Sequence, residues 1–529
     1  MPDGLVREST RSTPGWTRPL LYAAALVPFV PGASQFLQRG VPDLLFTGDG
    51  AALELGTLQA AHGVQWLGPY SRFGWHHPGP AFFYLALPIY EAFGHRGPAL
   101  NLFAFVANIA TAVAIVVVAR RLRGRVFALA VGALLAVYML VGAPFVLANE
   151  WNPIFPLLPL ALLSFLAACV ASGDTRVVPA FAFVASVIVQ THVGYTPEVL
   201  ALSTVAVVAR WGWASQVPLS RLQQMDRRLM GLTVGILVLS WALPLYQAVT
   251  GRPGNLQLLA RFFVPKHWAE HSWRAAIAVV VDQMAVMPLA LARTVRVIVQ
   301  SRWPVVFGLA SAQVVVLVAA LATAVRRRDR GLAVLATIGI VQIAAAILGV
   351  RAIRGDIEIY LVAWASLLGF MSCVVVAAWL VGALRRRLGG VPAAWTVGVA
   401  AAALLALAIS LPVARSPVIR APDFVAEQLA RDVETYLRSL PANPPVIRIA
   451  SRGTWPTAVA VVLHLTKVGI PIFVEREWIS VVGPAFALRG GEHPNLFFGD
   501  HDFGAQARNQ SDLTFVAAAG DIYVYAGRM

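Results

Sequence analysis

Apolar runs of about twenty residues recur along most of the chain, with short polar segments between them. A run of about 20 apolar residues is long enough to cross the hydrocarbon core of a bilayer as a helix. We therefore expect a polytopic α-helical membrane protein with about eleven transmembrane helices, the first retained rather than cleaved as a signal peptide. The expected spans are, within a few residues, 20–37, 98–119, 126–147, 154–170, 177–190, 199–213, 229–249, 304–325, 332–350, 359–381 and 391–411.

Arginine clusters predict how these spans are oriented. Arginines concentrate near residues 120–125, 221–228, 326–330 and 385–387. Because basic side chains collect in cytoplasmic loops, and because eleven spans put all four clusters on one side, we expect a cytoplasmic N-terminus in the plasma membrane. The outer segments are then 38–97, 149–152, 191–197, 250–303, 351–358 and the C-terminal tail.

Two further apolar segments do not fit a simple span. Residues 80–94 are too short and contain Pro88, so they predict a helix lying in the outer interface. Residues 275–292 are long enough but carry Asp282 and Pro288. A span here would move the last two arginine clusters outside, so we expect an interfacial or re-entrant segment.

The pattern changes near Ser416, where apolar runs give way to closely spaced Pro, Gly and Asn. We therefore divide the chain into a transmembrane domain, 1–415, and a small extracytoplasmic α/β domain, 416–529. Within the second domain, hydrophobic periodicity predicts helices at 423–440 and 454–468 and strands at 446–450, 471–474, 513–517 and 521–526.

Composition agrees with this assignment. Of the 529 residues 58% are hydrophobic and 13% are charged, against roughly 25% charged residues in soluble domains, which excludes an ordinary soluble enzyme. The net charge of +16 is explained by loop arginines, so no nucleic-acid partner is expected. Cys169 and Cys373 lie in apolar runs and predict neither a disulfide framework nor a thiolate metal site.

Polar residues are concentrated in the first outer segment. Asp49 directly follows the first span and lies between Gly48 and Gly50, so its backbone can approach a ligand closely. Glu54 follows five residues later and would share its face if the segment is helical. Candidate contacts for a substrate follow at Tyr70, Arg72, His76 and His77.

At these motifs the chain resembles the GT-C superfamily of membrane glycosyltransferases, such as protein O-mannosyltransferases and aminoarabinose transferases that act on lipid A. The resemblance covers roughly the first 200 residues and returns weakly near residue 350. It is carried by TGDGAALEL (47–55), HPGPAFFYLALPIYEAFG (77–94), ARRLRGR (119–125), NEWNP (149–153) and VRAIRGDIEIYLVAWAS (350–366).

The resemblance implies transfer of a hexose or pentose from a polyprenyl-phosphate donor to a glycan, lipid or protein acceptor on the extracytoplasmic face. It implies inversion at the sugar carbon by direct displacement. Asp49 is the candidate base, and Glu54, a second candidate catalytic residue, lies five positions away and does not reproduce the family's tight Asp–Glu pairing. Such a transfer needs a base for the acceptor hydroxyl and cations for the departing phosphate, for which Arg351 and Arg354 are candidates. Other candidate contacts at span ends are Glu150, Asn152, Gln190 and His192. No cofactor is expected. His76 and His77 suggest a divalent-metal pair, but neighbouring histidines rarely chelate one ion without further ligands, so a metal is not supported.

Other interpretations stay open from the sequence. Asp49 could be a solvated loop residue, Arg351 and Arg354 could reach to lipid headgroups, and Glu150 and Asn152 could cap helices. GDHDFG (499–504) favours a surface turn over a metal cluster. A flippase of lipid-linked saccharides would need ionisable residues at mid-membrane, and the spans carry almost none. A membrane-anchored protein whose C-terminal domain binds glycan is the third hypothesis.

Overall fold

The computed structural model describes residues 17–214, 227–264, 269–294, 300, 302–388, 422–440, 443–488, 490 and 493–527. These residues form two compact units. The helical unit contains residues 1–38, 104–242 and 260–418, and the α/β unit contains residues 39–103, 243–259 and 419–529. The C-terminal domain expected from residue 416 thus begins close to a unit boundary, but the first outer segment joins it in the same unit.

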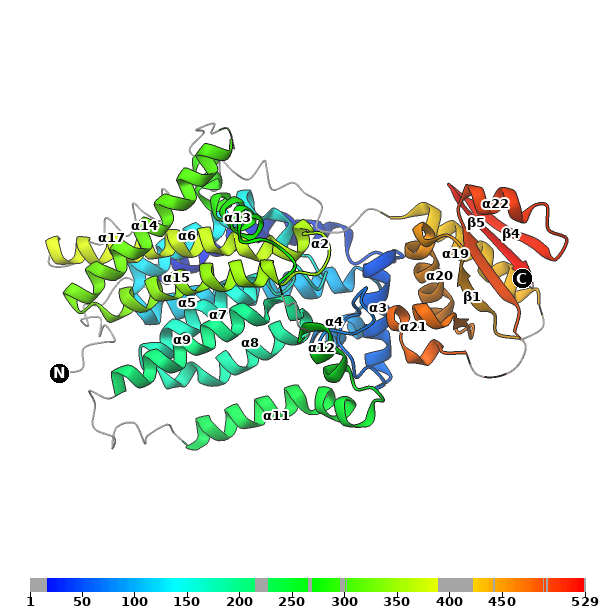
Figure 1. The fold of residues 1–529 in the computed structure, drawn as a ribbon, viewed down its shortest axis with the longest axis horizontal. Coiled ribbons are helices and arrows are strands. Elements are labelled where there is room, and N and C mark those ends of the chain that lie inside the picture. The colour runs from blue at the N-terminus through cyan, green and yellow to red at the C-terminus, as the bar shows by residue number, and fades with distance from the viewer. Residues whose placement is uncertain are drawn as a thin grey trace. The chain divides into compact units, whose positions relative to one another are not determined.

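The helical unit contains most of the predicted spans as helices (Figure 1). Most begin and end close to the predicted bounds, as in α14, which has Pro304 in its first turn and is followed by Arg328 in the left-handed region (φ 54°). An exception is α6, which ends at Val137, ten residues before the predicted end of its span. The helices are α1 (Thr17–Leu26), α2 (Val30–Arg39), α5 (Ala99–Arg123), α6 (Arg125–Val137), α7 (Leu157–Ala171), α8 (Val178–Thr191), α9 (Thr196–Ala214), α11 (Arg227–Thr250), α12 (Asn255–Phe263), α13 (Trp273–Thr294), α14 (Trp303–Arg327), α15 (Arg330–Arg351), α16 (Ile359–Val362) and α17 (Leu367–Leu388).

The chain is a multi-pass membrane protein. Within the described ranges seven helices are long and apolar enough to cross a membrane, and α11 exposes large apolar side chains such as Val238 and Leu239 (61% and 80% exposed). Exposed apolar surface of this kind is stable against lipid rather than water. The first expected span consists of α1 and α2 joined by a 3-10 turn, Val27–Phe29, and the last, 391–411, lies outside the described residues.

The structure of residues 275–292 bears on the prediction of an interfacial or re-entrant segment. They belong to α13, a continuous 22-residue helix that keeps Pro288 inside it and is long and apolar enough to span. It packs against α14, α15 and α17, and buried residues recur along its length, including Met284 and Met287. The segment expected to be interfacial or re-entrant is therefore a helix of the packed bundle, with the length and composition of a span.

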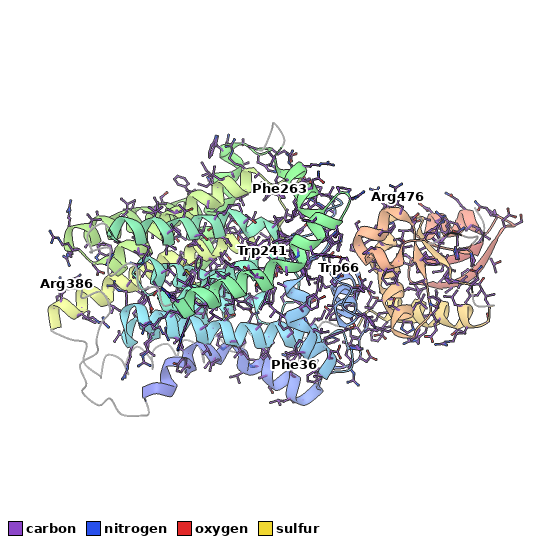
Figure 2. The ribbon with its side chains drawn as sticks, turned by 90° about the horizontal axis from the view of Figure 1, so that it is seen from below. Phe36, Trp66, Trp241, Phe263, Arg386 and Arg476 are labelled. Atoms are coloured by element: carbon purple, nitrogen blue, oxygen red, sulfur yellow. The ribbon has the colours of Figure 1, made fainter. Side chains whose placement is uncertain are left out.

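The arginine-rich ends of three long helices meet in the helical unit. Arg123 at the end of α5 makes two bonds to Asp329, which precedes α15, at 2.7 and 2.9 Å. Its guanidinium also lies 3.4 Å from the Ala378 carbonyl of α17. Arg386, further along α17, lies at one end of this unit (Figure 2). The ends of α5 and α17 and the start of α15 therefore lie together in this unit.

The α/β unit is built on a five-stranded sheet of order β2-β1-β3-β5-β4. The strands are β1 (Val446–Ile449), β2 (Phe473–Val474), β3 (Asn495–Gly499), β4 (Leu513–Ala519) and β5 (Ile522–Gly527). β1 pairs in parallel with β2 and β3, whereas β5 runs antiparallel to β3 and β4. All four strands predicted from the sequence are present, and β3 was not predicted.

Helices cover both faces of this sheet. Side chains alternate along β5: Val524 packs with α19 (Phe424–Arg438) and α20 (Trp455–Lys467) in the main core, whereas Tyr525 packs on the opposite face with Phe503 of α22 (His501–Ala507). Asp500 accepts a bond from the Phe503 backbone N–H and caps α22. The GDHDFG segment, for which the sequence favours a surface turn, thus forms the exposed start of α22.

The first outer segment folds onto the same core. It forms α3 (Gly48–Ala61) and α4 (Ala81–Ala92), and α4 is the short helix predicted for residues 80–94. α3 packs against α4 on one side and against α20 on the other, and apolar side chains such as Ala51 and Leu55 belong to the sheet core. Figure 1 shows α3 and α20 close together in this unit.

Candidate active site

Asp49 lies in the first turn of α3, where the helix dipole favours a negative charge. Gly48 begins the helix with a φ of +54°, a conformation that a side chain would strain. The Tyr70 hydroxyl donates a hydrogen bond to Asp49 Oδ1, and the Tyr70 ring packs edge-on against Trp455, with centroids 6.3 Å apart. The structure therefore brings two of the predicted site residues together.

Tyr70 is held by a short turn that returns to His76. The two residues form an isolated antiparallel bridge, and the His76 backbone is fixed by Asn255, which accepts from its N–H and donates to its carbonyl, both at 2.8 Å. Burial lowers the pKa of His76 to about 4, against the opposing effect of a backbone bond with Ser480. Arg72 lies at the exposed tip of the turn, 5.1 Å from the Phe73 ring.

His77 lies in the protein interior. Its side chain is buried and its ring packs edge-on against Trp75, with centroids 5.5 Å apart. Gly68 lies so close to this segment that a Cβ there would be 2.5 Å from the His77 carbonyl oxygen. Among the residues that the structure describes, no group of three or more His, Cys, Asp or Glu side chains could hold a metal ion.

Glu54 does not share the face of Asp49. Five residues along a helix correspond to about 140° of rotation, and the Glu54 side chain has no exposed surface. It forms an ion pair with Lys467 of α20 and accepts a bond from the Tyr90 hydroxyl at 3.1 Å. Burial raises the pKa of Glu54, while the Lys467 ammonium and the Tyr90 hydroxyl oppose that rise.

Four other predicted site residues lie in turns or helix ends of the helical unit. Gln190 donates to the Ser240 carbonyl of α11 at 2.7 Å, and His192 Nδ1 accepts from the Gly194 N–H at 3.2 Å. Glu150 and Asn152 are 1% and 8% exposed. All four are therefore engaged within the protein interior.

The turns that carry these residues converge with residues 350–366. The Tyr195 hydroxyl donates to the Pro153 carbonyl at 2.7 Å, and its ring lies 6.0 Å from Trp364. Trp151 lies 4.9 Å from the Tyr360 ring. Two of the motif segments that carry the family resemblance, 149–153 and 350–366, thus meet at the turn that holds Tyr195.

Arg351 and Arg354 are packed by residues 262–273 of the same unit. The Arg351 guanidinium lies 3.7 Å from the centroid of the Trp273 ring and donates to the His271 carbonyl at 3.3 Å. Arg354 forms a 3.3 Å ion pair with Glu270. Both are half-buried, and Arg351 is held by an aromatic ring and a carbonyl whereas Arg354 is held by a carboxylate.

Known proteins match this chain in fold and not in sequence. No family model matches the chain, and no curated protein matches it in sequence. ArnT from Cupriavidus metallidurans bound to undecaprenyl phosphate superposes with a TM-score of 0.56 at 15% identity, covering 97% of this chain and 98% of that one. The chain has the ArnT fold. Apo ArnT gives the same TM-score at 16% identity and equal coverage.

An apo oligosaccharyltransferase from Archaeoglobus fulgidus is similar over 86% of this chain and 65% of that one, with a TM-score of 0.44 and 13% identity. The superposition on ArnT extends over nearly the full length of both chains. It confirms the predicted helical membrane fold with a small C-terminal α/β domain, well beyond the first 200 residues that carry the resemblance in sequence.

The sequence did not single out several residues that contact the predicted site. Lys467 and Trp455 lie about 400 residues from the partners they contact on or beside α3, and Asn255 fixes the turn at His76 from α12. Lys467 is one of only two lysines in a chain that otherwise uses arginine. The rarity of lysine is the one feature of the sequence that could have singled out Lys467.

Proposed function

We propose that the chain is a membrane glycosyltransferase that moves a sugar from a polyprenyl-phosphate donor to an acceptor hydroxyl at the extracytoplasmic face of the plasma membrane. The observation that carries the proposal is a carboxylate, Asp49, at the start of a helix within a chain of ArnT fold. The ArnT structure holds undecaprenyl phosphate, which supports a polyprenyl-phosphate donor here. The acceptor is a glycan, a lipid or a protein.

Chemistry at the membrane surface follows from the donor. Each buried CH₂ of an isoprenoid tail contributes about 0.8 kcal/mol to membrane binding, so a polyprenyl-linked sugar stays in the bilayer and reacts at its boundary. The catalytic groups must therefore be reached from that boundary.

Asp49 acts as the base in this proposal. Its carboxylate accepts the proton of the acceptor hydroxyl, the hydroxyl oxygen forms a bond to the anomeric carbon, and the bond from that carbon to the phosphate oxygen breaks. Polyprenyl phosphate leaves with the electron pair, and the sugar carbon is inverted. Positioned base catalysis contributes typically 10²- to 10⁴-fold. Tyr70 holds Oδ1, so Oδ2 is the oxygen assigned to the proton.

The negative charge on the departing phosphate needs cations. Arg351 and Arg354 stay the predicted partners, because a guanidinium can bind phosphate through two parallel bonds. Glu54 is assigned to the support of α3 rather than to the chemistry, since it has no exposed surface.

The test uses purified full-length protein with a panel of polyprenyl-phosphate sugars and measures donor consumption and transfer. Asp49→Asn keeps the shape of the side chain and should reduce turnover at least about 100-fold, with insertion and the thermal midpoint unchanged. The control Asp502→Asn changes a carboxylate on the exposed α22 and should retain turnover. Full activity of Asp49→Asn would remove Asp49 from the mechanism, and no turnover with any donor would favour the flippase hypothesis.

A further inference from the structure

The helix that carries Asp49 is held by the C-terminal module, defined here as residues 419–529 of the α/β unit. At its start, a Cβ on Gly48 would lie 3.4 Å from both Pro456 and Trp455. Near its end, Gln59 donates to the Val482 carbonyl at 2.6 Å. Between these points Glu54 pairs with Lys467. The C-terminal module thus contacts α3 at its start, in its middle and near its end.

The ion pair differs from the other two contacts because it is charged and buried. Glu54 is 0% exposed, and the Lys467 side chain is 20% exposed. Space around the carboxylate is closed, since a Cβ on Gly97 would lie 2.7 Å from Glu54 Oε2. A buried carboxylate is stable only with a partner charge and hydrogen bonds. Lys467 supplies the charge and Tyr90 the additional bond.

We propose that Lys467 is a positioning residue: by holding Glu54 it fixes the rotation and height of α3, and thereby places the Asp49 carboxylate for the acceptor hydroxyl. The inference rests on the proposed function of Asp49. A helix is stiff over this length, since Asp49 lies only about 7.5 Å along the axis from Glu54. A shift of about 1 Å at a reacting group can cost on the order of 100-fold in rate, so loss of this anchor should be visible in turnover.

The test compares three variants of the full-length protein. Lys467→Met keeps the length of the side chain and removes its charge. The double variant Glu54→Gln with Lys467→Met removes both charges and leaves no unpaired ion in the core. The matched control is Arg431→Met, which removes a cation from an exposed pair with Glu427 on α19 of the same module. Hydrogen exchange of residues 48–61 and steady-state kinetics with an accepted polyprenyl-phosphate sugar are the two readouts.

Lys467→Met is expected to lose at least about tenfold of the exchange protection in α3. Its kcat should fall about 10- to 100-fold, with the donor KM changed by less than about twofold. The double variant should regain the wild-type thermal midpoint while kcat stays reduced at least about tenfold. Arg431→Met should match the wild type in both readouts.

The outcomes separate this inference from the proposed function and from a role of the ion pair in stability alone. Wild-type kcat in the double variant would overturn it, because the pair would then serve stability alone. Unchanged protection of α3 in Lys467→Met would overturn it whatever the activity. If Lys467→Met does not fold, the double variant carries both readouts. A wild type that consumes no donor would refute the proposed function, and the exchange measurement would still decide whether Lys467 holds α3.

Discussion

The Asp49 carboxylate can act as a base only if its orientation is controlled while one oxygen stays open. The bond from Tyr70 to Oδ1 meets the first condition. The packing of the Tyr70 ring on Trp455 restricts the hydroxyl in turn. A single phenol thus connects the carboxylate to the turn at His76 and to the start of α20.

Tyr70→Phe should lower kcat about 10- to 100-fold, because it removes the bond that orients Asp49 but keeps the ring. The thermal midpoint should change little, since the packing on Trp455 remains. Steady-state kinetics with the accepted donor measure the effect. The control Tyr246→Phe removes a hydroxyl from a tyrosine that is 53% exposed, and equal losses in both variants would contradict the role of Tyr70.

His76 should make the stability of the α/β unit depend on pH. Its pKa is lowered to about 4 in the folded protein, so protons bind more readily to the unfolded chain between about pH 6.5 and 4. Stability is therefore fully present above pH 6.5 and is lost as the pH falls through 4, by up to about 3 kcal/mol.

Unfolding in detergent at pH 7, 5.5 and 4.5 measures this slope. His76→Gln should flatten it, whereas the control His501→Gln, which removes an exposed imidazole, should keep it. An unchanged slope in His76→Gln would assign the pH dependence to other groups.

At the scale of elements, Asp329 stabilises the junction between α5 and α15 in two separable ways. Asp329 pairs with Arg123 and also caps α15 by accepting from the Leu332 N–H at 3.1 Å. Burial raises the pKa of Asp329, but the bonds from Arg123 more than offset this and hold the pKa below its usual value. The carboxylate is therefore charged at neutral pH.

Asp329→Asn should destabilise the helical unit by about 2 kcal/mol, because it leaves Arg123 without its partner charge while the amide still caps α15. Asp329→Ala removes the cap as well and should cost about 1 kcal/mol more. Thermal unfolding in detergent measures both. Equal midpoints for the two variants would show that the cap contributes nothing.

Elements with a strong local pattern could be predicted, and those fixed by tertiary contacts could not. α19 and α20 lie within two residues of their predicted bounds. β3 was missed because its five residues, NLFFG, follow closely on Pro494 and end at a glycine, a run too short to show alternation. For α13 the length of the apolar run, Asp282, Pro288 and the arginine clusters give opposing indications in the sequence, and the structure shows that Pro288 is accommodated within a continuous helix.

The candidate site could be predicted only as far as single residues. Asp49 and Tyr70 were both chosen from one polar segment and do meet. Glu54 was chosen for its spacing from Asp49, and its true partners are Lys467 and Tyr90. Lys467 could not be foreseen because nothing in the local sequence of either residue indicates a contact across about 400 positions.

At the scale of the whole molecule, the orientation of the spans is open to a direct test. In a background with Cys169→Ala and Cys373→Ala, the variant Arg72→Cys places a thiol in an exposed turn, and Arg386→Cys places one at the exposed end of α17. A membrane-impermeant maleimide on intact cells should label the first and not the second. The reverse result would put Asp49 on the cytoplasmic side and refute the proposed donor chemistry.

The pairing of Glu54 with Lys467 also sets an order of events during biosynthesis. The ribosome adds Lys467 413 residues after Glu54, which at 5–20 residues per second corresponds to a delay of about 20 to 80 s. During that interval α3 has been translocated but lacks the module that covers its apolar side, and its carboxylate has no counter-ion. Under the proposed function, a nascent chain is therefore inactive until the C-terminal module has emerged, and a chain that terminates before this module leaves an exposed apolar helix for quality-control proteases to recognise.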